Sequence, residues 1–235
     1  MPAVRRLFVL FHPTFAPAFR PRMQPTRLCL VRHGQTDWNA ERRVQGQLDV
    51  GLNATGEAQA RAVRPGLAGH GFAAAYSSDL ARAWRTAQIA TDGLDCALAA
   101  EPALRERNYG VYQGLTAAEA ELRVPLAFHH HQRRTPDYAY ETGETLAEFA
   151  ARVTAGLETL ARRHPGTSVL AFTHGGVLDI VYRVACGRDL SSPRDFALPN
   201  GAVNWIEIHA DRWQLLAWAD LSHLEQGQVE VVGEV

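Results

Sequence analysis

The chain contains 235 residues, of which 46% are hydrophobic, so it can form one large α/β domain with a substantial core or two small domains. Its formal net charge of −1 argues against a surface that binds nucleic acid or anionic lipid. The three cysteines, Cys29, Cys96 and Cys186, are odd in number and widely separated. This spacing excludes a disulfide framework and a cysteine metal site, and it predicts a cytoplasmic protein.

The first 26 residues begin like an export signal, because Arg5 and Arg6 precede an apolar run. That run ends after five residues at His12 and Pro13, which is too short for the apolar region of a signal peptide. We therefore expect residues 1–26 to be a disordered leader, or the start to be annotated too far upstream, with Met23 as the true first residue. Residues 27–235 are predicted to form a single domain, and no later segment is apolar for long enough to span a membrane.

Residues 28–31 are mostly apolar and predict the end of a buried strand. The strand runs directly into Arg32, His33 and Gly34, which delivers a cation and an imidazole to the carboxyl edge of a sheet. Ligands bind at that edge in α/β proteins. Because Gly34 has no side chain, a ligand and the backbone can approach each other closely there.

A polar loop over residues 37–53 precedes a helix that we expect to be capped by Thr55 and to end near Pro65. Residues 72–76 predict a short buried strand, and residues 77–79 are expected to cap the helix that follows. The apolar residues of that helix can share one face: Leu80, Trp84, Ala87 and Ile89. Arg82 falls in its first turn, where free backbone N–H groups and the helix dipole favour an anion.

Residues 104–110 form a loop of mixed charge, and residues 115–145, named the cover segment here, have no clear periodicity. Residues 145–163 are patterned as an amphipathic helix. A second buried strand over 168–172 ends in Thr173, His174, Gly175 and Gly176 and leads into a helix over about 177–185. The last two strands are expected at 203–208 and 213–218.

This alternation of strands and helices predicts an α/β fold, a three-layer α/β/α sandwich with a mostly parallel central sheet. Arg32 and His33 then leave one strand end and His174 leaves another at the same edge. Arg82 approaches from a helix N-terminus. Each residue alone is commonly structural, but two strand-end histidines that are both followed by glycine indicate a functional site.

Two arginines and two histidines that converge are suited to a doubly charged phosphate group. A histidine in such a cluster either donates a hydrogen bond to the phosphoryl group or, when neutral, attacks phosphorus and forms a phosphohistidine. The second role requires one ring nitrogen to be held as N–H, for which a backbone carbonyl is suited.

A phosphoryl transfer also needs a group that protonates the leaving alkoxide. Glu106 is the best candidate, because a neighbouring phosphate favours a protonated carboxyl group. Taken alone, its place between Arg105 and Arg107 also fits a solvated ion pair. Glu106 would then take a proton from the water that attacks the phosphoenzyme. No metal or other cofactor is needed if the cationic residues neutralise the transition-state charge.

These motifs resemble the signature of the histidine phosphatase superfamily, which has the phosphoglycerate-mutase-like fold. The resemblance covers about residues 27–218 and includes residues 32–39, 43–46, 77–82, 104–106 and 173–176. It implies that His33 is the phosphorylated nucleophile, that Glu106 is the proton donor and acceptor, and that Arg32, Arg82 and His174 bind the phosphate. Further contacts to substrate or phosphate are expected from Asn39, Gln45, Gly46, Ser78, Gly175, Arg133 and Arg134.

The family contains phosphatases and cofactor-dependent phosphoglycerate mutases. The mutases carry a lysine where this chain has Ala117, and their covering segment is much longer, so the resemblance favours a metal-independent phosphatase acting on a small phosphorylated metabolite. Arg133 and Arg134 resemble an arginine pair of the mutases, which keeps the mutase as the alternative. A non-catalytic phosphate-binding protein is a third interpretation, disfavoured because the nucleophile and the acid are both present.

The run His129 to His131 does not predict a metal site, since consecutive histidines do not converge on one ion and no carboxylates accompany them. We expect it to lie with Arg133 and Arg134 over the active site. The tryptophans Trp205, Trp213 and Trp218 are interpreted as packing residues. A homodimer formed through a sheet edge is possible on this sequence, without specific support.

Overall fold

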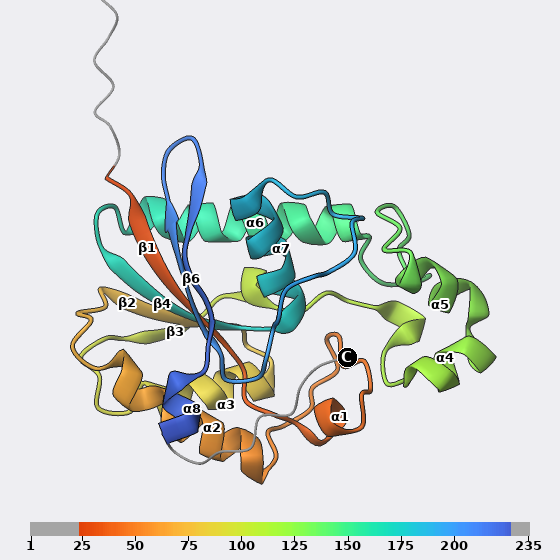
Figure 1. Cartoon of the computed structure of the whole chain (residues 1–235), viewed down its shortest axis with the longest axis horizontal. Helices are drawn as coiled ribbons and strands as arrows, with labels where there is room; N and C mark the ends of the chain where they lie inside the picture. The colour runs from red at the N-terminus through yellow and green to blue at the C-terminus, as the bar shows by residue number, and fades with distance from the viewer. Residues whose placement is uncertain (1–23, 227–235) are drawn as a thin grey trace, which may run out of the picture.

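The computed structural model describes residues 24–226, so the predicted leader lies almost entirely outside the described residues. A six-stranded sheet with the strand order β3-β2-β4-β1-β5-β6 forms the centre of the molecule (Figure 1). The strands are β1 (Thr26–Arg32), β2 (Ala74–Ser77), β3 (Leu98–Ala100), β4 (Ser168–Thr173), β5 (Val203–Ile208) and β6 (Trp213–Asp220).

The sheet is mostly parallel, as predicted. Strands β1, β2, β3 and β4 run in one direction, whereas β5 pairs antiparallel with β1 and β6 pairs antiparallel with β5. The register aligns Arg32 with Thr173, so that β1 and β4 end side by side. His33 and His174, each one residue beyond, therefore leave the sheet as neighbours.

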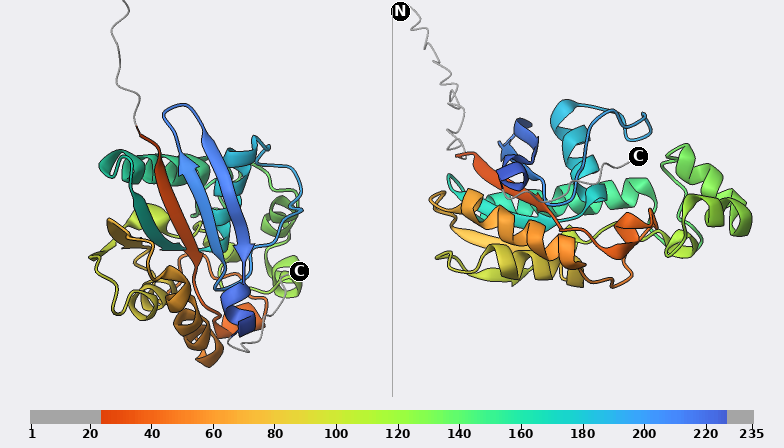
Figure 2. Two further views of the ribbon diagram at one scale, coloured as in Figure 1. Left: turned by 60° about the vertical axis from the view of Figure 1, so that its left-hand side comes forward. Right: turned by 60° about the horizontal axis from the view of Figure 1, so that its bottom comes forward.

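Helices cover both faces of the sheet (Figure 2), which confirms the three-layer arrangement. In β1, Leu28 and Leu30 pack into a core shared with α6 and α7, and the alternate residues Cys29 and Val31 pack toward α2 and α3. Among residues 24–226, no helix has the length and apolar character needed to cross a membrane. The longer helices are α2 (Ala54–Leu67), α3 (Ala81–Ala90), α6 (Leu146–Arg163) and α7 (Gly175–Cys186).

The cover segment contains two short helices that its sequence pattern does not reveal. Helix α4 spans Ala117–Arg123 and α5 spans Pro125–Gln132, and both lie beyond the end of α6, away from the sheet (Figure 1). They enclose a small separate cluster of buried side chains that includes Tyr112 and Tyr140. Other short elements that were not predicted are β3, α1 (Asp37–Ala40), η1 (Pro102–Leu104), η2 (Gly110–Tyr112) and α8 (Ser222–Gln226).

The predicted limits of α2 are wrong at both ends. Asn53 caps the helix, since its side-chain oxygen accepts a hydrogen bond from the backbone N–H of Gly56, and Thr55 lies inside the first turn. Pro65 does not end the helix either. Proline costs an intrahelical hydrogen bond, but in the last turn that loss is confined to the end of the helix, which continues to Leu67.

Helix α3 also differs from its prediction. No side chain among residues 77–79 caps it; the carboxylate of Asp49 accepts the backbone N–H of Ala81 instead. The predicted apolar face is wrong in part, because Trp84 and Ile89 are only half-buried. The buried face of α3 carries Arg82, Ala83, Thr86, Ala87 and Ala90.

Candidate active site

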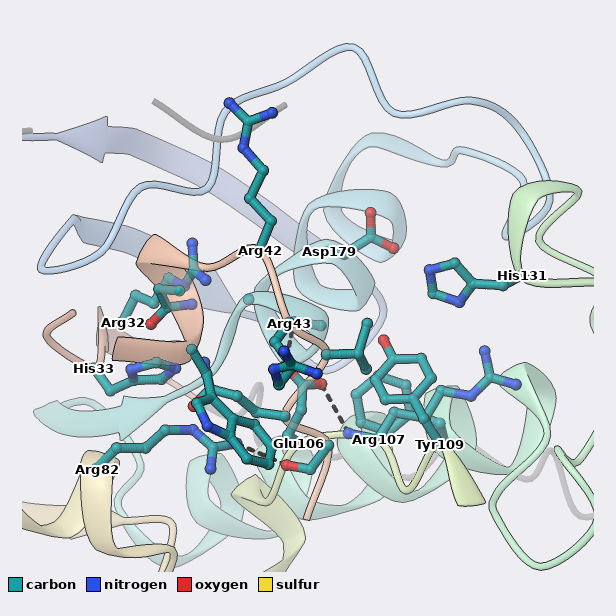
Figure 3. Close-up of a pocket in the computed structure, with 18 of the residues that line it drawn as sticks. Arg32, His33, Arg42, Arg43, Arg82, Glu106, Arg107, Tyr109, His131 and Asp179 are labelled. Carbon is teal, nitrogen blue, oxygen red and sulfur yellow. Dashed lines mark hydrogen bonds between the residues drawn. The ribbon is translucent and has the colours of Figure 1, made fainter. Parts of the chain in front are cut away.

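A cavity of about 330 Å³ opens where β1 and β4 end and α7 begins (Figure 3). Figure 3 shows Arg32, His33 and Arg82 grouped at one end of it and Tyr109 and His131 at the other. The lining residues are Arg32, His33, Gln35, Trp38, Asn39, Arg42, Arg43, Val44, Gln45, Gly46, Arg82, Glu106, Arg107, Tyr109, His131, Arg134, Tyr140, Leu146, Phe149, Gly175, Gly176, Asp179, Arg194 and Asn200.

The imidazole of His33 is buried and fixed in one tautomer. Its Nδ1 lies 2.7 Å from the carbonyl oxygen of Gly34, and because a carbonyl only accepts, Nδ1 must carry the proton. Burial, together with the charges of Arg82 and Arg32, holds the pKa of His33 well below its usual value. The ring is therefore neutral near pH 7, and Nε2 presents a lone pair.

The turn that carries His33 is held by close backbone contacts. A side chain on Gly34 would clash with the carbonyl oxygen of Gly56, because a Cβ there would lie 2.3 Å from it. The amide of Asn200 donates a hydrogen bond to the backbone carbonyl oxygen of His33 at 3.0 Å. These contacts fix the backbone on both sides of the imidazole.

Two buried arginines bring positive charge to His33. Arg82 donates hydrogen bonds to the carbonyl oxygens of Gly46 (2.7 Å) and Leu48 (3.0 Å), and Arg32 donates to the carbonyl oxygen of Leu198. Burial lowers the pKa of Arg82 to about 10, so its guanidinium remains charged at neutral pH. The guanidinium of Arg82 is held by neutral carbonyl oxygens, and both arginines bring positive charge to the place where an anionic ligand would bind.

His174 lies against His33, with 5.1 Å between the ring centroids. It is completely buried and is not among the residues that line the cavity. Burial is the main cause that holds its pKa well below the usual value, and Arg82, His33 and Arg32 lower it further. Its Nε2 lies 2.8 Å from the hydroxyl oxygen of Ser78, which is also buried and also does not line the cavity.

The carboxylate of Glu106 is held by two backbone N–H groups. One oxygen accepts from Arg107 at 2.7 Å and the other accepts from Gly176 at 2.9 Å, at the N-terminus of α7. A Cβ on Gly176 would lie 2.1 Å from a carboxylate oxygen of Glu106, so this contact requires glycine. The carboxyl group is thus fixed at the wall of the cavity.

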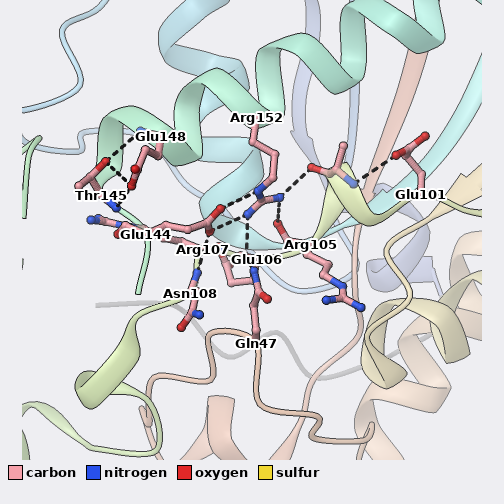
Figure 4. A network of polar contacts seen from close by, with 11 residues as sticks. Gln47, Glu101, Arg105, Glu106, Arg107, Asn108, Glu144, Thr145, Glu148 and Arg152 are labelled. Carbon is pink, nitrogen blue, oxygen red and sulfur yellow. Dashed lines mark hydrogen bonds and ion pairs between the residues drawn. The ribbon is translucent and has the colours of Figure 1, made fainter. Parts of the chain in front are cut away.

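Helix α6 holds the loop that carries Glu106 (Figure 4). Arg152 donates hydrogen bonds to the carbonyl oxygens of Ala103 (3.0 Å), Arg105 (3.0 Å) and Glu106 (3.2 Å). Its guanidinium also forms an ion pair with Glu144 at 2.7 Å. One side chain of α6 therefore holds three carbonyl groups of the short segment that carries Glu106.

The cavity carries a surplus of positive charge. Its lining includes two carboxylates, Glu106 and Asp179, against the arginines at positions 32, 42, 43, 82, 107, 134 and 194. Asp179 is already paired, because Arg134 from the cover segment and Arg183 from α7 both bind it. A site of this charge favours an anion with several oxygens.

The opposite end of the cavity is aromatic. His131 on α5 is stacked on Tyr112, and its Nδ1 lies 2.9 Å from the hydroxyl of Tyr140. Burial, with the charges of Arg107 and Arg134, lowers the pKa of His131 to about 4. This end therefore offers neutral aromatic surface beside the arginines.

No group of three or more His, Cys, Asp or Glu side chains between residues 24 and 226 is placed to hold a metal ion.

A comparison with known protein families adds a further observation. The model of the histidine phosphatase superfamily (branch 1) matches residues 28–221. The chain belongs to this superfamily. The match spans most of the chain and includes every element that lines the cavity, which confirms the resemblance inferred from the motifs.

Individual relatives of this histidine phosphatase carry both phosphatase and mutase names. The chain is 36% identical over 203 residues to phosphoglycerate mutase-like protein 4 of Arabidopsis thaliana, covering 85% of this chain and 87% of the relative. It is also 36% identical over 202 residues to a metal-independent phosphoserine phosphatase of the same plant, covering 85% and 83%. The solved structure of YhfR from Bacillus stearothermophilus superposes with a TM-score of 0.78 at 32% identity, covering 85% of this chain and 99% of that chain.

Most of the predicted site residues line the cavity of this histidine phosphatase. Those that do are Arg32, His33, Asn39, Gln45, Gly46, Arg82, Glu106, Arg134 and Gly175. Arg133 is exposed and does not line the cavity, and Arg134 is bound to Asp179. The structure therefore brings one arginine of the pair to the cavity wall.

Several residues that shape the site were not predicted from the sequence. Tyr109, Asn200 and Asp179 line the cavity, and Arg152 supports it from behind. Tyr109 follows Glu106 by three residues, and this closeness in the sequence could have predicted that it lies at the site. The other three approach from distant parts of the chain without any local motif.

Proposed function

We propose that this protein is a phosphatase that hydrolyses small phosphomonoesters through a phosphohistidine on His33. The observation that carries the proposal is the neutral imidazole of His33, whose Nδ1–H is bound by the Gly34 carbonyl oxygen while two arginines lie beside it. A neutral ring with a free Nε2 lone pair is a nucleophile. The membership of the superfamily and the phosphatase name of one relative support the same reaction class.

In the first step, Nε2 of His33 attacks phosphorus, a P–N bond forms and the P–O bond to the leaving group breaks. Glu106 in its protonated form gives its proton to the departing alkoxide. Each Glu106 oxygen accepts one backbone N–H and retains a further lone pair that can carry this proton. Arg32 and Arg82 stabilise the charge on the phosphoryl oxygens.

In the second step, a water molecule attacks the phosphohistidine. The Glu106 carboxylate takes a proton from that water, a P–O bond forms, the P–N bond breaks and inorganic phosphate leaves. His33 then returns to its neutral form with the proton still on Nδ1. The chemistry needs no group beyond those of the chain, and the relative described as a metal-independent phosphoserine phosphatase supports a metal-independent reaction.

The size of the cavity supports a small substrate. A volume of about 330 Å³ lies at the low end of the range for ligand sites, about 300–1,000 Å³. With the phosphoryl group beside His33, the leaving group would extend toward Tyr109, His131 and Tyr140. These side chains offer aromatic surface and hydroxyl groups rather than a deep apolar pocket.

The direct test is an assay with para-nitrophenyl phosphate and a panel of small phosphorylated metabolites, in the presence and absence of EDTA. We expect hydrolysis of at least one compound that EDTA leaves unchanged and that His33→Ala abolishes. Loss of activity with EDTA would contradict metal independence. Binding of inorganic phosphate without any hydrolysis would favour the non-catalytic alternative.

A phosphoglycerate mutase is the second candidate, favoured by the name of one relative. The structure weakens the argument from the arginine pair, because Arg133 is exposed and Arg134 is bound to Asp179. Interconversion of 2- and 3-phosphoglycerate that is faster than their hydrolysis would establish this candidate instead.

A further inference from the structure

Ser78 and His174 form a buried pair behind His33. Both side chains are fully buried, and the hydroxyl oxygen of Ser78 lies 2.8 Å from Nε2 of His174. The two residues come from the ends of different strands, Ser78 directly after β2 and His174 directly after β4. The pair is thus built by the sheet and not by a local turn.

The other ring nitrogen of His174 has no hydrogen-bond partner among residues 24–226. This atom, Nδ1, is buried, and the ring lies 5.1 Å from that of His33. A buried polar atom without a partner costs free energy unless a ligand supplies the missing bond. Because the ring of His174 is neutral, one nitrogen carries a proton and the other carries a lone pair.

The hydroxyl of Ser78 decides between the two tautomers. Its oxygen already accepts the backbone N–H of Leu80 at 3.3 Å, and the described residues offer its proton one acceptor, Nε2 of His174. If Ser78 donates to Nε2, the ring proton sits on Nδ1. In the opposite tautomer Nε2–H donates to Ser78, the serine proton has no acceptor among residues 24–226, and Nδ1 presents a lone pair that would repel a phosphoryl oxygen.

We propose that Ser78 is a positioning residue that holds His174 as the Nδ1–H tautomer, so that Nδ1–H donates a hydrogen bond to the phosphoryl group on His33. The role of this donor rests on the proposed function, whereas the tautomer itself does not. Ser78 then acts through His174 and does not bind the phosphate directly. This replaces the prediction from the sequence that Ser78 is a phosphate ligand.

The test is nitrogen NMR of the full chain labelled with ¹⁵N-histidine, near pH 7, with His174→Gln used to assign the signals. A protonated and an unprotonated ring nitrogen resonate far apart, so the spectrum reports the tautomer without any substrate. We expect wild-type His174 to carry its proton on Nδ1, and Ser78→Ala to populate the Nε2–H form. A proton on Nε2 in the wild type, or an unchanged tautomer in Ser78→Ala, would overturn the proposal.

Ser77→Ala is the matched control. Ser77 is equally buried, but its hydroxyl donates its hydrogen bond to the backbone carbonyl oxygen of Ser78 and not to His174. We expect Ser77→Ala to keep the Nδ1–H tautomer and the wild-type kcat, and Ser78→Ala to lower kcat about 10- to 100-fold with a smaller change in KM. An equal loss of kcat in both variants would mean that Ser78 acts only through packing.

These readouts separate the inference from the function on which it rests. Suppose that the wild type shows no phosphatase activity but has the predicted tautomer of His174, and that Ser78→Ala does not have it. The proposed function then fails, and the role of Ser78 in setting the tautomer stands. If the wild type is active and Ser78→Ala changes neither tautomer nor kcat, the inference fails and the function stands.

Discussion

The reactivity proposed for His33 depends on one hydrogen bond, between its Nδ1–H and the carbonyl oxygen of Gly34. The same carbonyl would stabilise a doubly protonated ring, but burial and the two arginines oppose that form more strongly and lower the pKa of His33. The nucleophile is therefore neutral over a wider range of pH than a histidine in water.

This leads to a prediction for the pH dependence of the rate. Because burial and the two arginines hold the pKa of His33 well below about 6.5, protonation of the nucleophile should not reduce kcat/KM as the pH falls from about 7 through about 6.5. The measurement is kcat/KM against pH for two phosphomonoesters whose own phosphate pKa values differ. A change of slope in this plot that shifts with the substrate reports the pKa of the substrate phosphate. A change of slope near pH 6.5 that is the same for both substrates would contradict a lowered pKa of His33.

At the scale of single residues, the sequence predicts the side chains at strand ends. It does not predict the residues from distant segments that hold them in place. Arg32, His33 and Glu106 were found because a charged or imidazole side chain directly after an apolar strand, or within a charged loop, is visible locally. Asn200 donates to the carbonyl oxygen of His33 from 167 positions away. No local pattern announces such a contact, because it depends on how β5 is placed beside β1.

Among the elements, α6 does more than cover the sheet. The amphipathic pattern predicted for residues 145–163 is confirmed, since the apolar residues Leu146, Phe149, Val153, Leu157 and Leu160 are buried. Its other contribution is Arg152, which looks like an ordinary surface arginine in the sequence but binds three carbonyl oxygens of the loop that carries Glu106. The periodicity of a sequence predicts which apolar residues are buried, but it does not predict such polar contacts.

We predict that Arg152→Met lowers kcat by about 10-fold or more, because the Glu106 carboxyl group loses its fixed position. The change should also destabilise the protein by about 1–3 kcal/mol, since Glu144 and the carbonyl oxygens lose a charged donor. Activity and urea unfolding measure the two effects. The control is Arg162→Met on the same helix, where the side chain is 55% exposed and, within residues 24–226, pairs with Glu158 and Thr159 alone. A similar loss of kcat there would contradict the role of Arg152.

The cover segment marks the limit of prediction at this scale. Its polar, aromatic and histidine-rich sequence lacks a 3.6-residue period, because α4 and α5 pack onto a small aromatic cluster and not onto the main core. Arg134 joins this segment to α7 through Asp179.

The strands β1 and β4, by contrast, are apolar and buried on both faces. For that reason the sequence predicts both strands and the edge of the sheet at which the site lies.

For the molecule as a whole, the nearly neutral net charge of the sequence does not reveal that the cavity is positively charged. A net charge of −1 is spread over the chain, while arginines gather at one cavity. That concentration opposes the protonation of nearby histidines. The pKa values of His33, His174 and His131 are all lowered, with burial as the largest cause.

The lowered histidine pKa values predict how stability depends on pH. The unfolded chain binds protons at these histidines below about pH 6.5, whereas the folded chain does not until the pH reaches the lowered values, about 4 for His131. Stability should therefore fall as the pH decreases from about 6.5, and urea unfolding midpoints at about pH 7.5 and about pH 5 would measure the fall. His131→Asn should reduce this dependence of the free energy of unfolding on pH. His129→Asn, at an exposed position of α5, should leave it unchanged. The same dependence on pH in both variants would contradict the account.

The most direct test of the central claim is to trap the phosphoenzyme. Wild-type protein is mixed with a phosphomonoester that it hydrolyses, quenched rapidly in base and analysed by intact and peptide mass spectrometry. We predict one phosphoryl group, stable in base and labile in acid, on the peptide that contains His33, and none in His33→Ala. Full hydrolysis by His33→Ala, or a phosphoryl group on any other residue of the active wild type, would contradict a phosphohistidine mechanism at His33.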